Sequence, residues 1–313
     1  MFSLTTRSAS QSQRIKQILR YKTIFMAEPG GTLQEEFTPV SIPVSSGGNI
    51  AGKAWGNPKG QPVLGLHGWL NNAATFDNIA PLLDKDIYFV SIDLPGHGHS
   101  YHRSQSCRLH FVDYLVDVRD VIKGLGWDKF SFFCHSMGAG VASYFAAAQP
   151  ELVQKMEDLP RLLGRSLNSP PVPTENKVYK TWDEIVTRVW DANKKLDSLL
   201  SRDDVAVIAR RGSICIDEGY KFSHDNRLKE PSLLYLPHET DAEFIKAIQC
   251  PTLLIIAEES IFKEGLNKKV ENAGNDKIKV VTAPGGHHLQ LYSHKDIAAL
   301  ANQFLLSSSS SAS

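Results

Sequence analysis

The chain has 313 residues, of which 42% are apolar, and its 34 Lys and Arg residues are balanced by 34 Asp and Glu residues. This size and apolar content allow one large α/β domain with an insertion, or two smaller domains, and argue against a disordered chain. The lack of net charge provides no general attraction for nucleic acid, and no run of about eighteen apolar residues predicts a membrane span.

The N-terminal residues and the cysteines bear on the cellular compartment. Residues 1–27 contain five basic residues, several Ser and Thr, and no acid, which predicts either an organelle transit peptide or a disordered basic tail. The four cysteines are scattered without zinc-type spacing, which favours free thiols in a reducing compartment. We therefore expect an intracellular protein, either cytoplasmic or, if the basic segment acts as a signal, mitochondrial or peroxisomal.

The first half of the chain alternates predicted strands with predicted helices. A Ser-Ser-Gly-Gly turn separates the first two strands and predicts a hairpin. The predicted strands are residues 37–44, 49–56, 61–69, 87–96 and 130–134. The predicted helices, from the spacing of apolar or small residues, are residues 76–83, 109–125 and 137–148.

The second half begins with a different composition. Residues 151–240 are charged and contain several prolines, with helical patterns near 180–200 and 203–211. Strand patterns return at 251–257 and 278–286, and a last helix is predicted over 297–306. This alternation predicts an α/β fold whose mostly parallel sheet is covered by helices on both faces.

The composition also predicts how the chain is divided. We expect a basic extension, a core formed by two separate segments, a helical cap inserted between them, and a Ser-rich tail. The corresponding residues are 1–36 for the extension, 37–150 and 241–306 for the core, 151–240 for the cap and 307–313 for the tail.

Ser136 follows an apolar strand directly and precedes a helix of small residues, in the stretch FSFFCHSMGAG. The nucleophile-elbow pattern G-x-S-x-G occupies this position between a strand and a helix. Gly138 matches the second glycine, whereas Cys134 replaces the first. Ser136 is therefore predicted to be a nucleophile, with a simple helix cap as the alternative.

Two main-chain N–H groups are predicted to stabilise an oxyanion. Attack on a carbonyl carbon places negative charge on its oxygen, which preorganised N–H donors can hold. One donor would be Met137, the residue after the nucleophile. The other would be Trp69, in the loop that follows the strand ending in Leu-His-Gly-Trp.

A late histidine is predicted to be the general base. His287 follows the last predicted strand in Pro-Gly-Gly-His-His, and His288 is the alternative. The order nucleophile, acid, base places the acid after strand 251–257, where Glu258 and Glu259 are both candidates. More remote acids are Asp217 and Asp225.

Histidines are also frequent in the segment Leu-Pro-Gly-His-Gly-His-Ser that ends at Ser100. A metal site is one interpretation, but no carboxylates or cysteines with ligand spacing accompany them. We expect a turn that terminates the strand.

The motifs together resemble the α/β-hydrolase superfamily, because LHGW, DLPGHGHS, HSMGAG and PGGHHLQL occur in that family's order and approximate spacing. The segments GKAWG and VLGLHGWLNNAATFDNIAPLL are similar to the serine hydrolase-like proteins, and RRG (210–212) and residues 225–228 extend the likeness into the cap. The resemblance covers about residues 37–150 and 250–306. It implies a hydrolase fold without a cofactor, with Ser136 as nucleophile and His287 as base, but no particular substrate.

Three features depart from the family pattern. Cys134 replaces the usual glycine, and Ser260 lies where many relatives have their acid. Relatives also continue with an apolar core strand after Val153, whereas this chain reads Gln-Lys-Met-Glu-Asp-Leu-Pro. Either a more polar segment replaces that core strand, or the chain lacks the strand.

The predicted function is that of a serine hydrolase that cleaves a small-molecule carboxylic ester or thioester through a Ser–His–acid triad and an acyl-enzyme. The alternative is a catalytically impaired hydrolase fold that binds a small ligand or a partner. A third interpretation is an enzyme that uses Cys134, which the strand is expected to bury. The sequence predicts no nucleic-acid partner and does not define the oligomeric state.

Overall fold

The computed structural model describes residues 37–107, 109–159, 175–229 and 238–307, without the side chains of 155–159 and 238–241. The described residues belong to one compact unit. The predicted basic extension and most of the Ser-rich tail lie outside the described residues.

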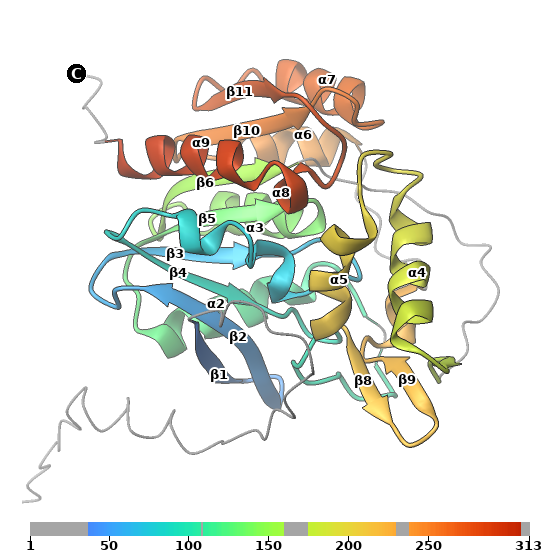
Figure 1. Cartoon of the computed structure of the whole chain (residues 1–313). Helices are drawn as coiled ribbons and strands as arrows, with labels where there is room; N and C mark the ends of the chain where they lie inside the picture. Colours follow the sequence, from blue (N-terminus) through green and yellow to red (C-terminus); the bar gives the residue numbers. More distant parts are fainter. Residues whose placement is uncertain (1–36, 108, 160–174, 230–237, 308–313) are drawn as a thin grey trace, which may run out of the picture. The chain divides into compact units, whose positions relative to one another are not determined.

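An eight-stranded sheet forms the centre of this unit, in the order β1-β2-β4-β3-β5-β6-β10-β11 (Figure 1). β1 and β2 form the predicted hairpin, and β2 also pairs antiparallel with β4. All other pairs are parallel, which confirms the expected type of sheet. The strands are β1 Thr38–Val44, β2 Gly48–Gly56, β3 Gln61–Leu66, β4 Ile87–Ile92, β5 Phe130–His135, β6 Val153–Leu159, β10 Thr252–Ala257 and β11 Ile278–Ala283.

Helices cover both faces of the sheet because successive strand side chains point to opposite sides. In β5, Phe130, Phe132 and Cys134 pack with α2 (Asp113–Leu125) and α3 (Met137–Ala148). Phe133 enters the core on the other face, which includes residues of α9. The other helices of the core are α6 His238–Lys246, α7 Lys263–Ala273, α8 Leu289–Tyr292 and α9 His294–Leu306. Of the three helices predicted in the first half, those over 109–125 and 137–148 are confirmed as α2 and α3.

The predicted helix over 76–83 is instead two short 3-10 helices, η1 (Ala73–Phe76) and η2 (Ala80–Leu82). Asn72 caps η1 by accepting a hydrogen bond from the Ala74 N–H. Pro81 lies in the first turn of η2 and has no N–H to donate, so it suits a helix start but not a helix interior.

β6 occupies the position where the sequence left a core strand in question. Its backbone pairs in parallel with β5 on one side and β10 on the other, and Met156 lies opposite both Phe132 and Thr252. The first alternative is therefore the one observed: a more polar segment replaces the apolar strand. A sheet ladder is formed by main-chain N–H and C=O groups, so polar residues can complete it.

The segment between β6 and β10 contains both helices and a small sheet. The predicted helical stretches form α4 (Trp182–Asn193) and α5 (Arg202–Arg211). A three-stranded antiparallel sheet, which the sequence analysis did not predict, accompanies them. It consists of β7 Val178–Tyr179, β9 Gly219–Phe222 and β8 Ser213–Ile216, and a 3-10 helix, η3 Asn226–Lys229, follows it. We refer to residues 175–229 as the inserted segment.

A buried ion pair joins the inserted segment to the end of β4. The Arg211 guanidinium contacts the Asp93 carboxylate at 2.8 Å, and Asp93 also accepts hydrogen bonds from the N–H groups of Ala73 and His99. Burial alone would raise the pKa of Asp93, but Arg211 and the two N–H groups outweigh it and hold the pKa below its usual value. Asp93 is therefore a charged anchor between the sheet and α5.

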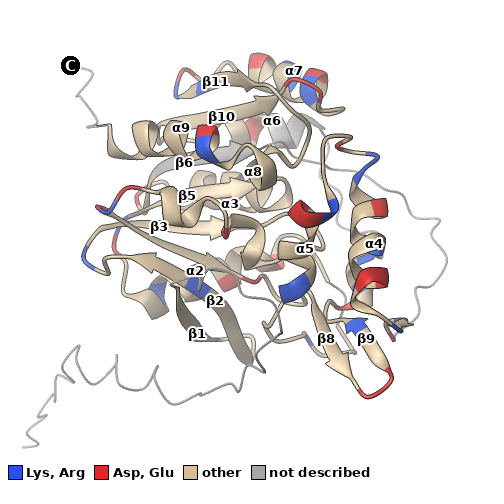
Figure 2. Cartoon of the chain, viewed as in Figure 1, with Lys and Arg blue, Asp and Glu red and all other residues tan. Residues whose placement is uncertain are grey.

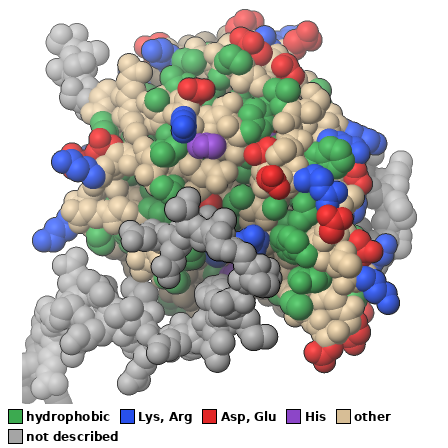
Figure 3. All heavy atoms as spheres, viewed as in Figure 1, with side chains coloured by type: hydrophobic (Ala, Val, Ile, Leu, Met, Phe, Trp, Pro, Cys, Tyr) green, Lys and Arg blue, Asp and Glu red, His purple; other side chains and the backbone are tan. Residues whose placement is uncertain are grey.

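Charged residues of both signs lie mainly on helices and turns around the sheet (Figure 2). On the face drawn in Figure 3, they are mixed with hydrophobic side chains and form no continuous basic surface. Within the described residues, every helix is too short or too polar to cross a bilayer.

Candidate active site

Ser136 lies in the turn between β5 and α3 and has an unusual backbone conformation. Its φ is 51° and its ψ is −115°, and only one other non-glycine among the described residues, Leu70, has a positive φ. Such a conformation is unfavourable for a residue with a side chain and is associated with functional turns. The Ser136 side chain makes no capping hydrogen bond to α3. The helix-cap interpretation therefore does not account for this serine.

Small residues around Ser136 allow close approach of neighbouring backbone. A Cβ atom at Gly138 would collide with the carbonyl group of Leu66 in β3, so only glycine fits this turn. The Cys134 side chain instead points into the core beside α3 and is fully buried. Cysteine is tolerated at the position where relatives have glycine because the core accommodates it, and its burial argues against Cys134 as a nucleophile.

His287 is the histidine that the fold brings to Ser136. Its Nε2 lies 3.1 Å from the Ser136 Oγ, although 151 positions separate the two residues in the chain. It belongs to the loop between β11 and α8, at the carboxyl edge of the sheet where parallel strands present their loops. His288, the alternative base, makes no ring hydrogen bond to Ser136. The pair Ser136–His287 thus has the geometry of a nucleophile and its base.

The predicted acids do not complete this arrangement. Glu258 and Glu259 are exposed, and their main-chain N–H groups bind the carbonyls of Ala283 and Gly285. The Nδ1 atom of His287 is buried and has no hydrogen-bond partner. Burial lowers the pKa of His287 to about 4, and no neighbouring charge raises it. Among the described residues, no carboxylate orients this imidazole.

The remoter acids also serve other purposes. Asp225 is paired with Arg227 at 2.6 Å, and burial, which would raise its pKa, is outweighed by this pairing. Asp217 is exposed in the turn between β8 and β9. The identity of a third triad member therefore stays a prediction.

The loop after β3 passes directly over Ser136. A Cβ atom at Gly68 would lie 3.2 Å from the Cβ of Ser136. Among the residues that the structure describes, neither the Trp69 N–H nor the Met137 N–H donates to another main-chain group outside regular helices and strands. The Trp69 indole donates to the carbonyl of Leu228 at 2.8 Å, which ties this loop to the inserted segment.

Two buried histidines fix the conformation of that loop. The Nε2 of His67 accepts from the Leu94 N–H at 3.0 Å, and its Nδ1 bonds to the Gly68 carbonyl. The Nε2 of His97 accepts from the Leu70 N–H at 3.2 Å. His97, which belongs to the Leu-Pro-Gly-His segment, thus supports the turn expected there and the adjoining loop after β3.

The inserted segment contributes one further residue, Asp197, to the surroundings of His287. Asp197 is buried and accepts a hydrogen bond from the His288 N–H at 2.7 Å. The Tyr292 hydroxyl contacts the same carboxylate and accepts from the Gly286 N–H. A Cβ at Gly286 would collide with the Asp197 carboxylate. Asp197 therefore holds the loop that carries His287, and no local sequence pattern marks it.

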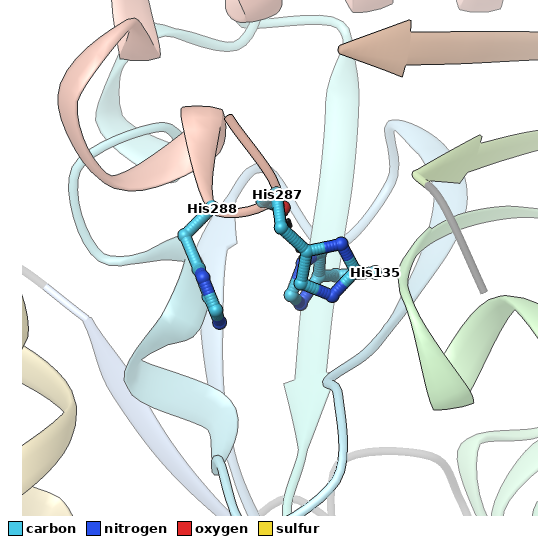
Figure 4. A group of neighbouring side chains, drawn as sticks. All are labelled: His135, His287 and His288. Carbon is cyan, nitrogen blue, oxygen red and sulfur yellow. Dashed lines mark hydrogen bonds between the residues drawn. The ribbon is translucent and has the colours of Figure 1, made fainter. Parts of the chain in front are cut away.

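His135, the residue directly before Ser136, is also not marked by the sequence pattern. Its Nε2 bonds to the main-chain carbonyl of His287 at 3.1 Å, and it gathers with His287 and His288 beneath the loop before α8 (Figure 4). Its position before the serine in the elbow could have marked it as a neighbour of the base loop.

Comparison with known proteins places this fold in a class. The family model described as "alpha/beta hydrolase fold" matches residues 61–156. The structure of a hypothetical protein from Pseudomonas aeruginosa PAO1 superposes with a TM-score of 0.75 at 29% identity, covering 85% of this chain and 99% of that one. The class of protein is therefore the α/β hydrolases.

Similarity to individual proteins narrows the class. A serine hydrolase-like protein of Dictyostelium discoideum is 34% identical over 286 residues, which cover 80% of this chain and 77% of that protein. Serine hydrolase-like protein 2 of Homo sapiens is 30% identical, with 82% of this chain and 91% of that protein covered. The chain belongs to the family of serine hydrolase-like proteins.

Proposed function

We propose that the protein is a serine hydrolase that cleaves a small-molecule carboxylic ester or thioester. The observation that carries the proposal is the 3.1 Å separation of Ser136 Oγ and His287 Nε2, on a serine that adopts a positive φ in the sharp turn between β5 and α3. A serine with this partner and this backbone is suited to nucleophilic attack.

In the proposed reaction, the Ser136 oxygen attacks the carbonyl carbon while its proton passes to Nε2 of His287. The N–H groups of Trp69 and Met137 hold the oxyanion. Collapse of the tetrahedral intermediate expels the alcohol or thiol, which takes the proton from His287, and leaves an acyl-enzyme on Ser136. Water, deprotonated by His287, then releases the acid and restores the serine.

The absence of an acid contact bears on the expected rate. In a triad the carboxylate accepts the Nδ1–H bond and stabilises the imidazolium, and loss of this function costs about 10⁴-fold in the trypsin example. Here His287 Nδ1 has no such partner and Glu258 and Glu259 are exposed. We infer that the described arrangement acts as a Ser–His dyad with slow turnover. Either glutamate could complete a triad only after the loop following β10 rearranges.

Apolar side chains next to the pair favour an apolar acyl group. Trp69 is 50% exposed in the loop after β3, and Ile261 is 66% exposed next to Phe262, whose ring packs against His287. Tyr179, Trp182 and Trp190 do not add to this surface because they pack in the core of the inserted segment. We propose that this segment acts as the predicted cap.

Hydrolysis of p-nitrophenyl esters with acyl chains of graded length tests the proposal, together with an acyl thioester. We expect turnover that depends on chain length and disappears in Ser136→Ala. Ser143, which is buried in α3 and bonds to the Ala139 carbonyl, offers a control in Ser143→Ala. Turnover that persists in Ser136→Ala would refute Ser136 as the nucleophile.

The alternative, a hydrolase fold that binds a ligand without turnover, has one observation in its favour, the buried Nδ1 of His287 without a partner. The two functions differ in the reactivity of Ser136. A serine that is acylated slowly but stoichiometrically supports the hydrolase, whereas an inert serine supports the binding protein.

A further inference from the structure

Three buried histidines form a cluster beside Ser136. His135 lies at the end of β5, and His287 and His288 lie in the loop between β11 and α8. One ring nitrogen from each lies within 4.8 Å of one from each of the others. The three side chains gather under this loop in Figure 4. Two segments that are distant in sequence thus place three imidazoles together.

The hydrogen bonds of these rings leave the same atom free in each. His135 Nε2 faces a carbonyl oxygen, so it carries the proton and its Nδ1 holds a lone pair. His287 Nε2 faces the Ser136 hydroxyl. The Nδ1 atoms of His135, His287 and His288 are all buried and without a hydrogen-bond partner. Buried polar atoms are rarely left in this state, and three in one cluster indicate a capacity for a ligand.

The chemical character of the cluster suits a metal ion. An imidazole binds a transition metal through a ring nitrogen that carries no proton, and the buried Nδ1 atoms of the three rings have no hydrogen-bond partner. Three imidazole nitrogens and one water make the four-coordinate set that Zn²⁺ adopts in open sites.

A bound metal ion would draw the three rings together. Zn–N bonds of about 2.1 Å in a tetrahedron place ligand nitrogens about 3.4 Å apart. The ligand nitrogens lie within 4.8 Å of one another in the structure, so metal binding requires the side chains to move closer. The nearby Asp197 carboxylate does not occupy the ring nitrogens, because it accepts a hydrogen bond from the His288 main-chain N–H instead.

We propose that His135, His287 and His288 form a binding site for a divalent transition metal of the zinc type, and that its occupation inhibits the enzyme. The inhibition follows from which ring nitrogen of His287 carries the proton. A neutral imidazole has one proton, so a metal on Nδ1 requires that proton to lie on Nε2. Nε2 then has no lone pair to accept the Ser136 proton, and the serine is not activated. Removal of the metal returns the proton to Nδ1.

The inhibitory part rests on the proposed function, whereas the binding part does not. We therefore test binding directly, by titrating Zn²⁺ into the full-length protein in competition with a chromophoric chelator. We expect one equivalent to bind to the wild type, and at least tenfold weaker binding in His135→Asn and His288→Asn. Ser136→Ala keeps all three ligands and should bind as the wild type does. His102→Asn, which removes an exposed histidine, is the matched control.

A measurement on the wild type alone guards against variants that fail to fold. The Co²⁺-loaded protein should show the visible absorption of a four-coordinate ion, and Mg²⁺ should not displace it. Equal Zn²⁺ affinity in the wild type and both folded histidine variants, or an octahedral Co²⁺ spectrum, would overturn the site.

Ester hydrolysis then separates the two proposals. Zn²⁺ should inhibit the wild type and a chelator should reverse the inhibition. If the wild type binds Zn²⁺ specifically but hydrolyses no ester, the metal site is supported and the proposed function is rejected. Hydrolysis that is unaffected when the site is full would reject the inhibitory role.

Discussion

The structure contains two groups of buried histidines that differ in how their ring nitrogens are used. In the first group, His67 and His97 bond through both nitrogens to main-chain atoms of the loops after β3 and β4. In the second group, His135, His287 and His288 each leave a buried Nδ1 without a partner. Burial and a lowered pKa are common to both groups.

The difference separates structural from chemical roles. A buried imidazole with both nitrogens bonded stabilises a loop and has no capacity left for a reaction. A buried imidazole with a free nitrogen is less favourable for stability but can accept a proton or a metal ion. Burial and pKa alone would not distinguish the two groups, whereas the hydrogen-bond partners do.

The largest effect is expected from His287→Gln, which removes the base from the second group. Without it, Ser136 has no group to accept its proton, and general base catalysis contributes about 10²–10⁴-fold. We expect kcat/KM for a p-nitrophenyl ester to fall by this factor while the urea midpoint changes little. If activity fell only in proportion to the loss of folded protein, His287 would have a structural role, as His67 and His97 do, and our distinction between the two groups would be wrong.

For His67→Leu, in the first group, we expect a loss of stability rather than a direct loss of catalysis. The change leaves the Leu94 N–H and the Gly68 carbonyl without partners inside the protein, and each such group costs about 1–3 kcal/mol. We expect the free energy of unfolding in urea to fall by about 2–4 kcal/mol. The matched variant His288→Leu breaks no ring hydrogen bond of the described residues and should cost less. Equal losses in the two variants would contradict our division.

Acid pH should destabilise the fold through both groups. The pKa values of His67 and His287 fall to about 4, from an unfolded value of 6.5. The unfolded chain therefore binds protons first, and stability is lost as pH falls from about 6.5 to about 4. Each such histidine should lower the free energy of unfolding by about 2 kcal/mol between pH 7.5 and pH 5. Urea unfolding at the two pH values measures this, and an unchanged or higher midpoint at pH 5 would count against neutral buried histidines.

The smallest effect is expected from Asp197→Ala, which loosens the loop of the second group without touching the reacting atoms. Loss of the bonds to the His288 N–H and Tyr292 lets His287 shift, and misplacement by about 1 Å can cost up to about 10²-fold. We expect kcat to fall about tenfold with KM almost unchanged. Asp191→Ala, on the exposed part of α4, is the control and should behave as the wild type. A KM effect alone would show that Asp197 acts on substrate binding rather than on the loop.

The sequence predicted the parts of this account that depend on local pattern. The strand before Ser136 and the small residues after it predict the turn, and the apolar strands predict the parallel sheet. The pairing of Ser136 with His287 was predicted from the order of the motifs along the chain. Their contact itself depends on the arrangement of β5 and β11 in the sheet.

Other features depend on tertiary contacts that no local pattern reveals. Asp197 lies between two helices of the inserted segment, and only the fold brings it to the His288 N–H. The exposure of Glu258 and Glu259 follows from the turn after β10. Their main-chain N–H groups donate to the carbonyls of Ala283 and Gly285, at the end of β11 and just after it. β6 forms from a polar segment because its neighbours supply the ladder, which overrides its weak strand pattern.

Reaction with a fluorophosphonate probe tests the central claim most directly, because the probe reacts with a serine only when a base activates it. Mass spectrometry of the labelled wild-type protein should find one adduct, on Ser136, and both Ser136→Ala and His287→Gln should remain unlabelled. A folded wild type that stays unlabelled, or carries its adduct on another residue, would contradict the assignment of Ser136 and His287 as nucleophile and base.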